Sequence, residues 1–215
     1  MDSIRQDIDV LYEWMGGPTY TPSTSHDHNG VNSKLIFAGW NLVNVQTAAA
    51  AANMTFSSGL TTVYDEYILK LTDITVSTDD ASISFQCSTD SGSSFLGTNI
   101  YQLSYISIHS ASTVVIGSGV TAAAQVLLNN DAAGYGVGNA ANESFNGTIE
   151  IHLPTNTEFK QFDMRCGYTN PTSNKVTFTG SGECGTTSVI NGIRFSPSAG
   201  TFSGTGRLYG IRKTT

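Results

Sequence analysis

Two histidines separated by one residue, His26 and His28, are the side chains best suited to chemistry in this sequence. In an extended backbone, residues two positions apart point to the same side, so the two imidazoles would project together. Two nitrogens are too few for a stable transition-metal site in one chain. Around a three-fold axis they become six, an octahedral shell suited to iron, nickel or zinc. The alternative is two exposed histidines in a polar loop.

Patterns typical of hydrolytic catalysis are absent from the sequence. No G-x-S-x-G motif occurs, and neither His109 nor His152 belongs to a known catalytic sequence motif. Glu143, Glu150 and Glu158 are close in sequence, but strand alternation alone cannot bring two carboxylates to hydrolytic distance. We therefore expect solvent-facing carboxylates and no enzymatic activity.

The segment 88–95, STDSGSSF, resembles the S-x-D-x-G-x-x-W "Asp box" of sialidases, where the element is structural and repeats several times. Here it occurs once, with Phe95 in the place of the tryptophan. We expect a β-hairpin in which the Asp90 carboxylate accepts hydrogen bonds from turn amides and Gly92 has a positive φ.

The glycine-rich stretch 134–141 resembles a phosphate-binding loop, but it lacks the G-K-[ST] ending and a following predicted helix. We expect a flexible surface loop over 129–144 that suits contact with sugars or proteins. Tyr135, Asn139 and Asn142 are its candidate receptor-facing residues, because an aromatic ring among small polar groups offers a stacking face.

Composition favours strands and turns. Charged residues are only 13% of the chain, about half the usual share, so Ser, Thr, Asn and Gly must supply the polar surface. The net charge is −7 and no basic run of five residues occurs, so nucleic-acid binding is not expected. Three cysteines without C-x-x-C spacing exclude a zinc ribbon and predict three buried free thiols, with one disulfide as the alternative.

Targeting signals are not expected either. The first fifteen residues carry Asp2, Asp7 and Asp9 where a signal peptide has a basic region and an apolar run. No stretch approaches 18 apolar residues, so we expect no membrane insertion.

The sequence predicts one convincing helix, over residues 1–16. Ser3 and Gln6 fit a capping box, and Gly16-Gly17-Pro18 ends the pattern. The apolar face consists of Ile4, Ile8, Leu11, Trp14 and Met15. So short a helix is unstable alone in water, so this face packs on its own β domain, docks on another protein, or forms a short trimeric bundle.

An extended linker with the His-x-His pair is predicted over 17–55, because Pro18 and Pro22 stiffen its start. The alanine run 48–52 predicts either a helix or a short bridge between strands. Residues 56–215 contain at least eight alternating segments separated by turn residues, with a bend expected near Asp73. This pattern predicts an all-β, jelly-roll or β-sandwich head.

The segment 25–36, SHDHNGVNSKLI, resembles the H-x-H-x-G-x-x-S-x-x-I element of bacteriophage tail-fibre and baseplate proteins. Residues 192–195 and 200–211 are similar to the closing strands of phage jelly-roll domains, as are segments 64–71 and 88–95. The resemblance implies that His26 and His28 from three chains hold one iron, zinc or nickel ion on the axis. Gly30 would turn the chain and Ser33 would close the loop.

The resemblance implies a homotrimeric fibre or receptor-binding component of the tail or baseplate, located in the virion and assembled in the host bacterial cytoplasm. Its partners would be its own copies, another virion protein at the N-terminus and a host surface glycan. The expected trimer or anchor contacts are Ile4, Ile8, Leu11, Trp14, Met15, Leu35, Ile36 and Trp40. Alternatives are a capsid decoration or head-fibre protein and a carbohydrate-binding module.

Replacing both histidines tests the axial site. We expect His26→Ala/His28→Ala to lower the transition-metal content of the purified protein by one ion per three chains, measured by elemental analysis. An unchanged metal content in the variant would reduce the two histidines to loop residues.

Overall fold

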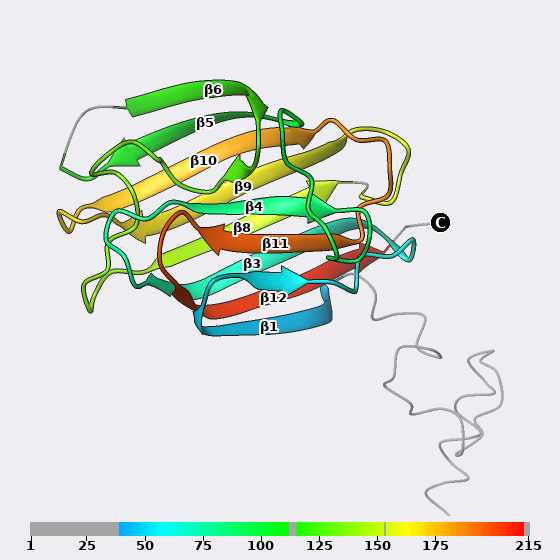
Figure 1. Cartoon of the computed structure of the whole chain (residues 1–215), viewed down its shortest axis with the longest axis horizontal. Helices are drawn as coiled ribbons and strands as arrows, with labels where there is room; N and C mark the ends of the chain where they lie inside the picture. The colour runs from blue at the N-terminus through cyan, green and yellow to red at the C-terminus, as the bar shows by residue number, and fades with distance from the viewer. Residues whose placement is uncertain (1–38, 112–114, 153, 213–215) are drawn as a thin grey trace, which may run out of the picture. The chain divides into compact units, whose positions relative to one another are not determined.

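The computed structural model describes residues 39–111, 115–152 and 154–212, and the described residues from Trp40 onward form one compact unit. Within this part the chain forms strands and no helix. The strands make an eight-stranded and a four-stranded antiparallel sheet packed face to face (Figure 1). The prediction of an all-β sandwich is confirmed. No helix in these ranges is long and apolar enough to span a membrane.

The large sheet has the order β1-β12-β3-β8-β9-β10-β5-β6, and the small sheet has the order β2-β11-β4-β7. The bounds of the large sheet are β1 Asn41–Ala51, β12 Phe202–Arg212, β3 Tyr64–Val76, β8 Phe145–His152, β9 Lys160–Thr169, β10 Lys175–Cys184, β5 Tyr101–His109 and β6 Val115–Ala123. Those of the small sheet are β2 Met54–Phe56, β11 Gly192–Pro197, β4 Ile83–Ser88 and β7 Val126–Leu127.

This order contains a complete eight-stranded jelly roll. Its two four-stranded sheets are β1-β12-β3-β8 and β2-β11-β4-β7, in which the first and last strands of the roll are neighbours. The remaining strands extend the large sheet beyond β8, where β9, β10, β5 and β6 follow one another in antiparallel pairs.

Alternation along the strands separates the core from the outer faces. Strands β5 and β9 show strict alternation between buried and exposed residues over most of their length. Between the sheets, Phe85 on β4 meets Phe162 on β9 edge to face, with ring centroids 5.1 Å apart. All three cysteines are free and buried, as predicted, and burial raises the pKa of the Cys166 thiol.

Strand β3 bends at Asp73, as predicted. The φ of Asp73 is 53°, and the pairing of β3 shifts register near this residue on both sides, against β8 and against β12. Such a bulge re-aims the strand without ending it.

Two expectations are corrected. The predicted linker is too long, because residues 41–51 form β1 and pair with β12, and β2 begins at Met54. The alanines enter a strand because Ala48 lies opposite Gly204, where pairing with small residues outweighs helix propensity. The predicted hairpin at 88–95 does not form, since β4 and the following β5 lie in different sheets.

The close approach of the sheets at Gly206 generates a stability prediction. A Cβ there would lie 2.7 Å from Met54 Sδ and 2.9 Å from Phe56 Cζ, both on the opposite sheet. We expect Gly206→Ala to lower the free energy of unfolding by about 1–3 kcal/mol through overpacking. The control is Gly119→Ala on β6, where nothing lies within 4 Å of the added carbon. Urea denaturation measures both, and equal stabilities would contradict the packing argument.

Candidate functional site

The outer face of the large sheet brings together polar side chains from three neighbouring strands. In the register, Glu66 on β3 lies opposite His152 on β8, and Glu150 on β8 lies opposite Asp163 on β9. Glu150 and His152 are two residues apart on one strand, so their side chains share this face. The four residues therefore form one cluster, which we call the outer-face cluster.

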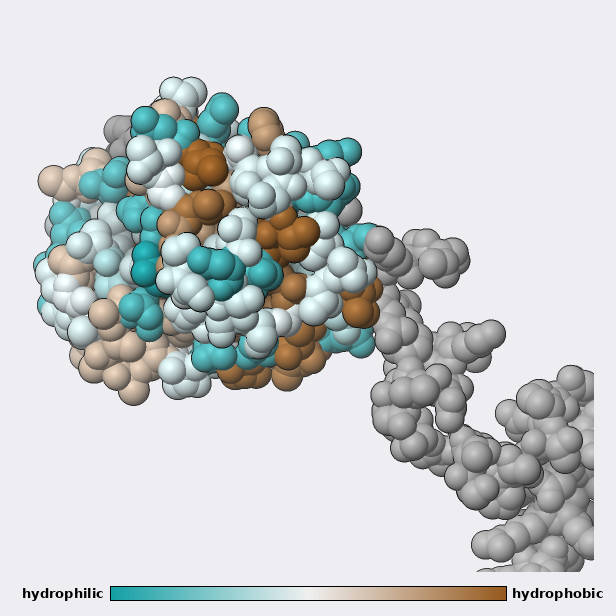
Figure 2. Space-filling view, turned by 45° about the vertical axis from the view of Figure 1, so that its right-hand side comes forward, coloured by the Kyte–Doolittle hydropathy of each residue, from teal (hydrophilic) through white to brown (hydrophobic). Residues whose placement is uncertain are grey.

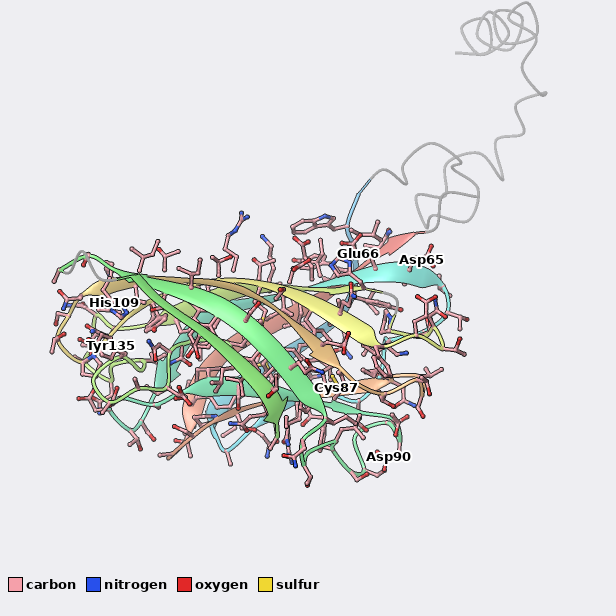
Figure 3. All side chains as sticks on the ribbon, turned by 90° about the horizontal axis from the view of Figure 1, so that it is seen from above. Asp65, Glu66, Cys87, Asp90, His109 and Tyr135 are labelled. Carbon is pink, nitrogen blue, oxygen red and sulfur yellow. The ribbon has the colours of Figure 1, made fainter. Side chains whose placement is uncertain are left out.

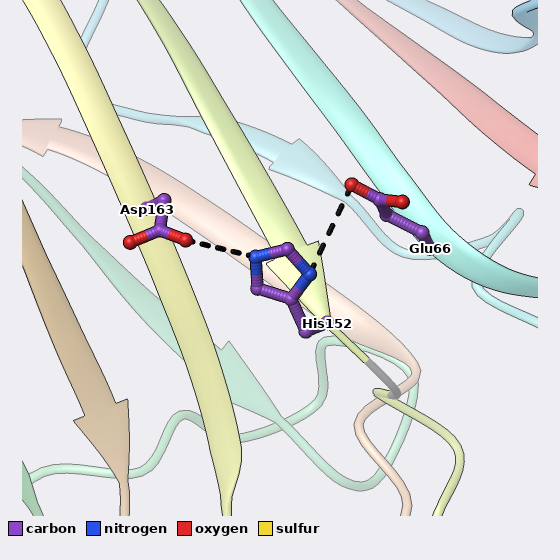
Figure 4. A network of polar contacts seen from close by, with 3 residues as sticks. All are labelled: Glu66, His152 and Asp163. Atoms are coloured by element: carbon purple, nitrogen blue, oxygen red, sulfur yellow. Dashed lines mark hydrogen bonds and ion pairs between the residues drawn. The ribbon is translucent and has the colours of Figure 1, made fainter.

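The imidazole of His152 stands at the centre of the outer-face cluster (Figure 4). Its Nε2 lies 3.0 Å from Asp163 Oδ2, and its Nδ1 lies 3.8 Å from Glu66 Oε1. The side chains of His152 and Glu66 are 34% and 32% exposed, whereas that of Asp163 is 60% exposed. The Glu66 and His152 side chains are thus about two-thirds buried, whereas the Asp163 side chain is mostly open to solvent.

Three members of this cluster could hold a metal ion. One ligand atom each from Glu66, Glu150 and His152 lie within 4.8 Å of one another. Carboxylate oxygens and an imidazole nitrogen form a mixed set that suits divalent transition metals. Without a metal, the same geometry lets a protonated His152 pair with both neighbouring carboxylates.

An open hollow of about 600 Å³, lined by polar and apolar residues, adjoins the outer-face cluster. Ser181 and Gly182 of β10 line part of it, and neither residue carries a bulky side chain. Gln102, Gln161 and Asp163 also line it. Amide, hydroxyl and carboxylate groups around a shallow floor can form hydrogen bonds with a polar ligand.

Two apolar patches lie on this same face, at its two ends. The β1 patch consists of Trp40, Leu42 and Val45, which are 49%, 57% and 45% exposed. The β5 patch consists of Ile106 and Ile108, which are 45% and 49% exposed. Hydrophobic residues also reach the surface elsewhere, as separate patches among polar residues (Figure 2).

Trp40 is the one predicted contact residue that the structure describes. Its ring lies 5.7 Å from that of Tyr209, and the Lys70 ammonium lies 4.8 Å from the Trp40 centroid. The other predicted contact and metal residues lie outside the described ranges; these are Ile4, Ile8, Leu11, Trp14, Met15, His26, His28, Leu35 and Ile36.

The loop 129–144, predicted to be flexible, is tied to the sandwich by hydrogen bonds. The Asp80 carboxylate accepts from the backbone amides of Gly134 and Gly136, each at 2.7 Å. Tyr135 is partly buried and packs edge to face against His109, with ring centroids 4.6 Å apart. Figure 3 shows these two residues together at one end of the molecule, far from Glu66 and Asp90.

Asn139 and Asn142, the other two candidate receptor-facing residues, are exposed. The backbone of Asn139 is held, because its amide donates to Asp79 Oδ1 at 3.1 Å. Glu143 is buried, and its carboxylate accepts from the Ala140 amide at 2.9 Å. The loop therefore presents amide side chains on a fixed backbone, while Tyr135 is turned toward the protein.

Asp90 organises the turn after β4. Its carboxylate accepts hydrogen bonds from the Ser94 hydroxyl at 2.6 Å, the Ser94 amide at 2.9 Å and the Ser88 hydroxyl at 2.7 Å. These bonds lower the pKa of Asp90 to about 2. Gly92 has a φ of 85°, so the predicted roles of Asp90 and Gly92 are confirmed although the hairpin is not.

The sequence did not reveal the outer-face cluster. Glu150 and His152 could be placed on one face by alternation, but Glu66 and Asp163 reach them only through pairing between distant segments. The Glu-x-His spacing on an expected strand is the one local signal that could have drawn attention to this site.

No protein-family description, curated protein or solved structure matches the chain. Fold and surface define it as a β-sandwich of jelly-roll strand order with a polar cluster and two apolar patches on one sheet face.

The depressed pKa of Asp90 predicts how the turn responds to acid. Because the folded pKa is about 2 and an unfolded aspartate titrates near ~3.9, the stabilisation is complete above pH ~4 and disappears as the pH falls toward 2. Carboxyl NMR titration should show Ser94→Ala raising the pKa of Asp90. Ser93→Ala is the control, since Ser93 donates to the Asp90 backbone carbonyl. Titration of Asp90 near pH 4 in the parent chain would contradict the assignment.

Proposed function

We propose that this chain is a non-enzymatic structural and attachment module that works as a homotrimer in the tail or baseplate of a bacteriophage. The observation that carries the proposed self-association is the pair of apolar patches at opposite ends of one sheet face. The phage part of the proposal is supported by the resemblance of segment 25–36 to the phage His-x-His element.

Two different patches suit a cyclic assembly, and the number three is what the resemblance of segment 25–36 implies. In a cyclic trimer each chain presents one surface to one neighbour and a different surface to the other. Leu42 lies on the first strand of the sheet order and Ile106 on the seventh, so about six strand spacings, roughly 29 Å, separate them. The β1 patch of one chain would then cover the β5 patch of the next.

The position of the β1 patch in the chain also fits this assembly. Trp40 follows His28 by twelve residues, which span at most about 40 Å, so the patch lies within that reach of the segment expected on the three-fold axis. Burial of these side chains between copies would remove half-exposed tryptophan, leucine and isoleucine from water, at about 25 cal/mol per Å² of apolar area.

A carbohydrate-binding module is the second candidate, and the hollow beside the outer-face cluster favours it. Its amide, hydroxyl and carboxylate groups match the hydrogen-bonding needs of a sugar. Micromolar binding on a glycan array that is lost in Gln102→Ala/Gln161→Ala would support this function, with or without the trimer. Antibody labelling of phage particles in the electron microscope would separate a tail or baseplate location from a capsid location.

A charge in the β1 patch should dissociate the trimer. We expect the full chain to have three times the monomer mass by light scattering and Leu42→Asp to have the mass of one chain, because a buried unpaired carboxylate is costly. Val63→Asp is the control, because Val63 is 52% exposed and belongs to neither patch. A monomeric parent chain would contradict the proposal.

A further inference from the structure

We propose that Glu66, Glu150 and His152 bind one divalent transition-metal ion in each chain, with Asp163 orienting the imidazole. This site lies on the outer face of the large sheet, within a single chain, and differs from the axial site predicted for His26 and His28. It goes beyond the attachment function proposed above, since it needs no second copy.

The spacing of the ligand atoms is close to that of a metal site. Two ligands on one tetrahedral zinc ion lie about 3.4 Å apart, given metal–ligand distances of about 2.0–2.2 Å. The Nδ1 of His152 and the Oε1 of Glu66 are 3.8 Å apart. With Glu150, the three ligand atoms lie within 4.8 Å of one another, so small side-chain rotations would close the site. The one-third exposure of Glu66 and His152 leaves room for such rotations.

Asp163 gives His152 the tautomer that a metal requires. Its Oδ2 lies 3.0 Å from Nε2, so the neutral imidazole donates its N–H to Asp163 and turns the Nδ1 lone pair toward Glu66. A carboxylate bonded to the far nitrogen of a metal-binding histidine is the usual arrangement around such ions. Asp163 is therefore a positioning residue, and the three ligands come from the adjacent strands β3 and β8.

Charge and surroundings favour a cation at this place. Three carboxylates, from Glu66, Glu150 and Asp163, converge on a single imidazole, while the cations Lys70 and Arg165 line a second hollow on the side of Glu150 and Asp163. Ile68, directly opposite Glu150, is 3% exposed, so part of the surroundings is apolar and screens this repulsion poorly. A divalent ion would neutralise two of these charges.

The ligand set selects the class of metal. Calcium and magnesium prefer shells made of oxygen, whereas an imidazole with two carboxylates suits zinc, manganese or cobalt. Three protein ligands on a half-exposed face leave the remaining positions to water. We expect zinc and cobalt to bind and calcium to bind far more weakly.

The test uses the full chain carrying His26→Ala/His28→Ala, which removes the axial pair and leaves His109 and His152 as the only histidines. After chelation, zinc is added during calorimetry and during imidazole ¹⁵N NMR. We expect one zinc per chain and a shift of the His152 Nδ1 resonance, while Nε2 keeps its proton and His109 does not respond.

Variants in the same background assign the ligands. Glu66→Gln/Glu150→Gln should abolish binding, and Asp163→Asn should weaken it about 10–100-fold, the usual effect of losing such a partner. Glu183→Gln on β10, outside the cluster, is the control and should bind zinc like its parent. Far-UV circular dichroism and melting in chelator check that each variant folds.

If zinc does not shift the His152 Nδ1 resonance of the His26→Ala/His28→Ala chain, the proposal is overturned, whatever the other variants show. Equal weakening by Glu183→Gln would also overturn it, since binding would then follow general negative charge. The oligomeric mass is measured separately, so failure of this site and failure of the trimer give different results.

Discussion

The antiparallel register of β3, β8 and β9 is the constraint on which the rest of the structure depends. It places Tyr67, Ile151 and Phe162 in one buried row across the core. It thereby places Glu66 and His152, each one position along, in the adjacent row on the outer face. A slip of one residue would exchange the two rows and bury carboxylates between the sheets. The hydrophobic core and the outer-face cluster therefore have a common origin.

Loops and sheet faces contribute differently to the surface. At the ends of the sandwich, Asp80 and Asp90 tie turns down by accepting hydrogen bonds from backbone amides, so those turns obtain their order from the chain itself. On the face of the large sheet, Leu42 and Ile106 remain about half exposed. Association between copies is therefore best sought on that face, and ligand contacts of the loops through exposed groups such as Asn139.

Sequence reasoning predicted what depends on local alternation and turn chemistry. The strands around Phe85 and Phe162, the bend at Asp73 and the positive φ of Gly92 all follow from neighbours within a few residues. Features that depend on pairing between distant segments were missed. The alanine run joined β1 because of its partner strand β12, and Glu66 meets His152 only through the register of the large sheet.

The central claim is that the β1 patch of one chain covers the β5 patch of the next around a three-fold axis. Cysteine cross-linking of the full chain with a short bis-maleimide tests it most directly, because the three native thiols are buried. A Leu42→Cys/Ile106→Cys variant should give covalent trimers on a denaturing gel, while either single substitution should give only monomers. Covalent dimers from a single substitution, or monomers alone from the double variant, would contradict the account.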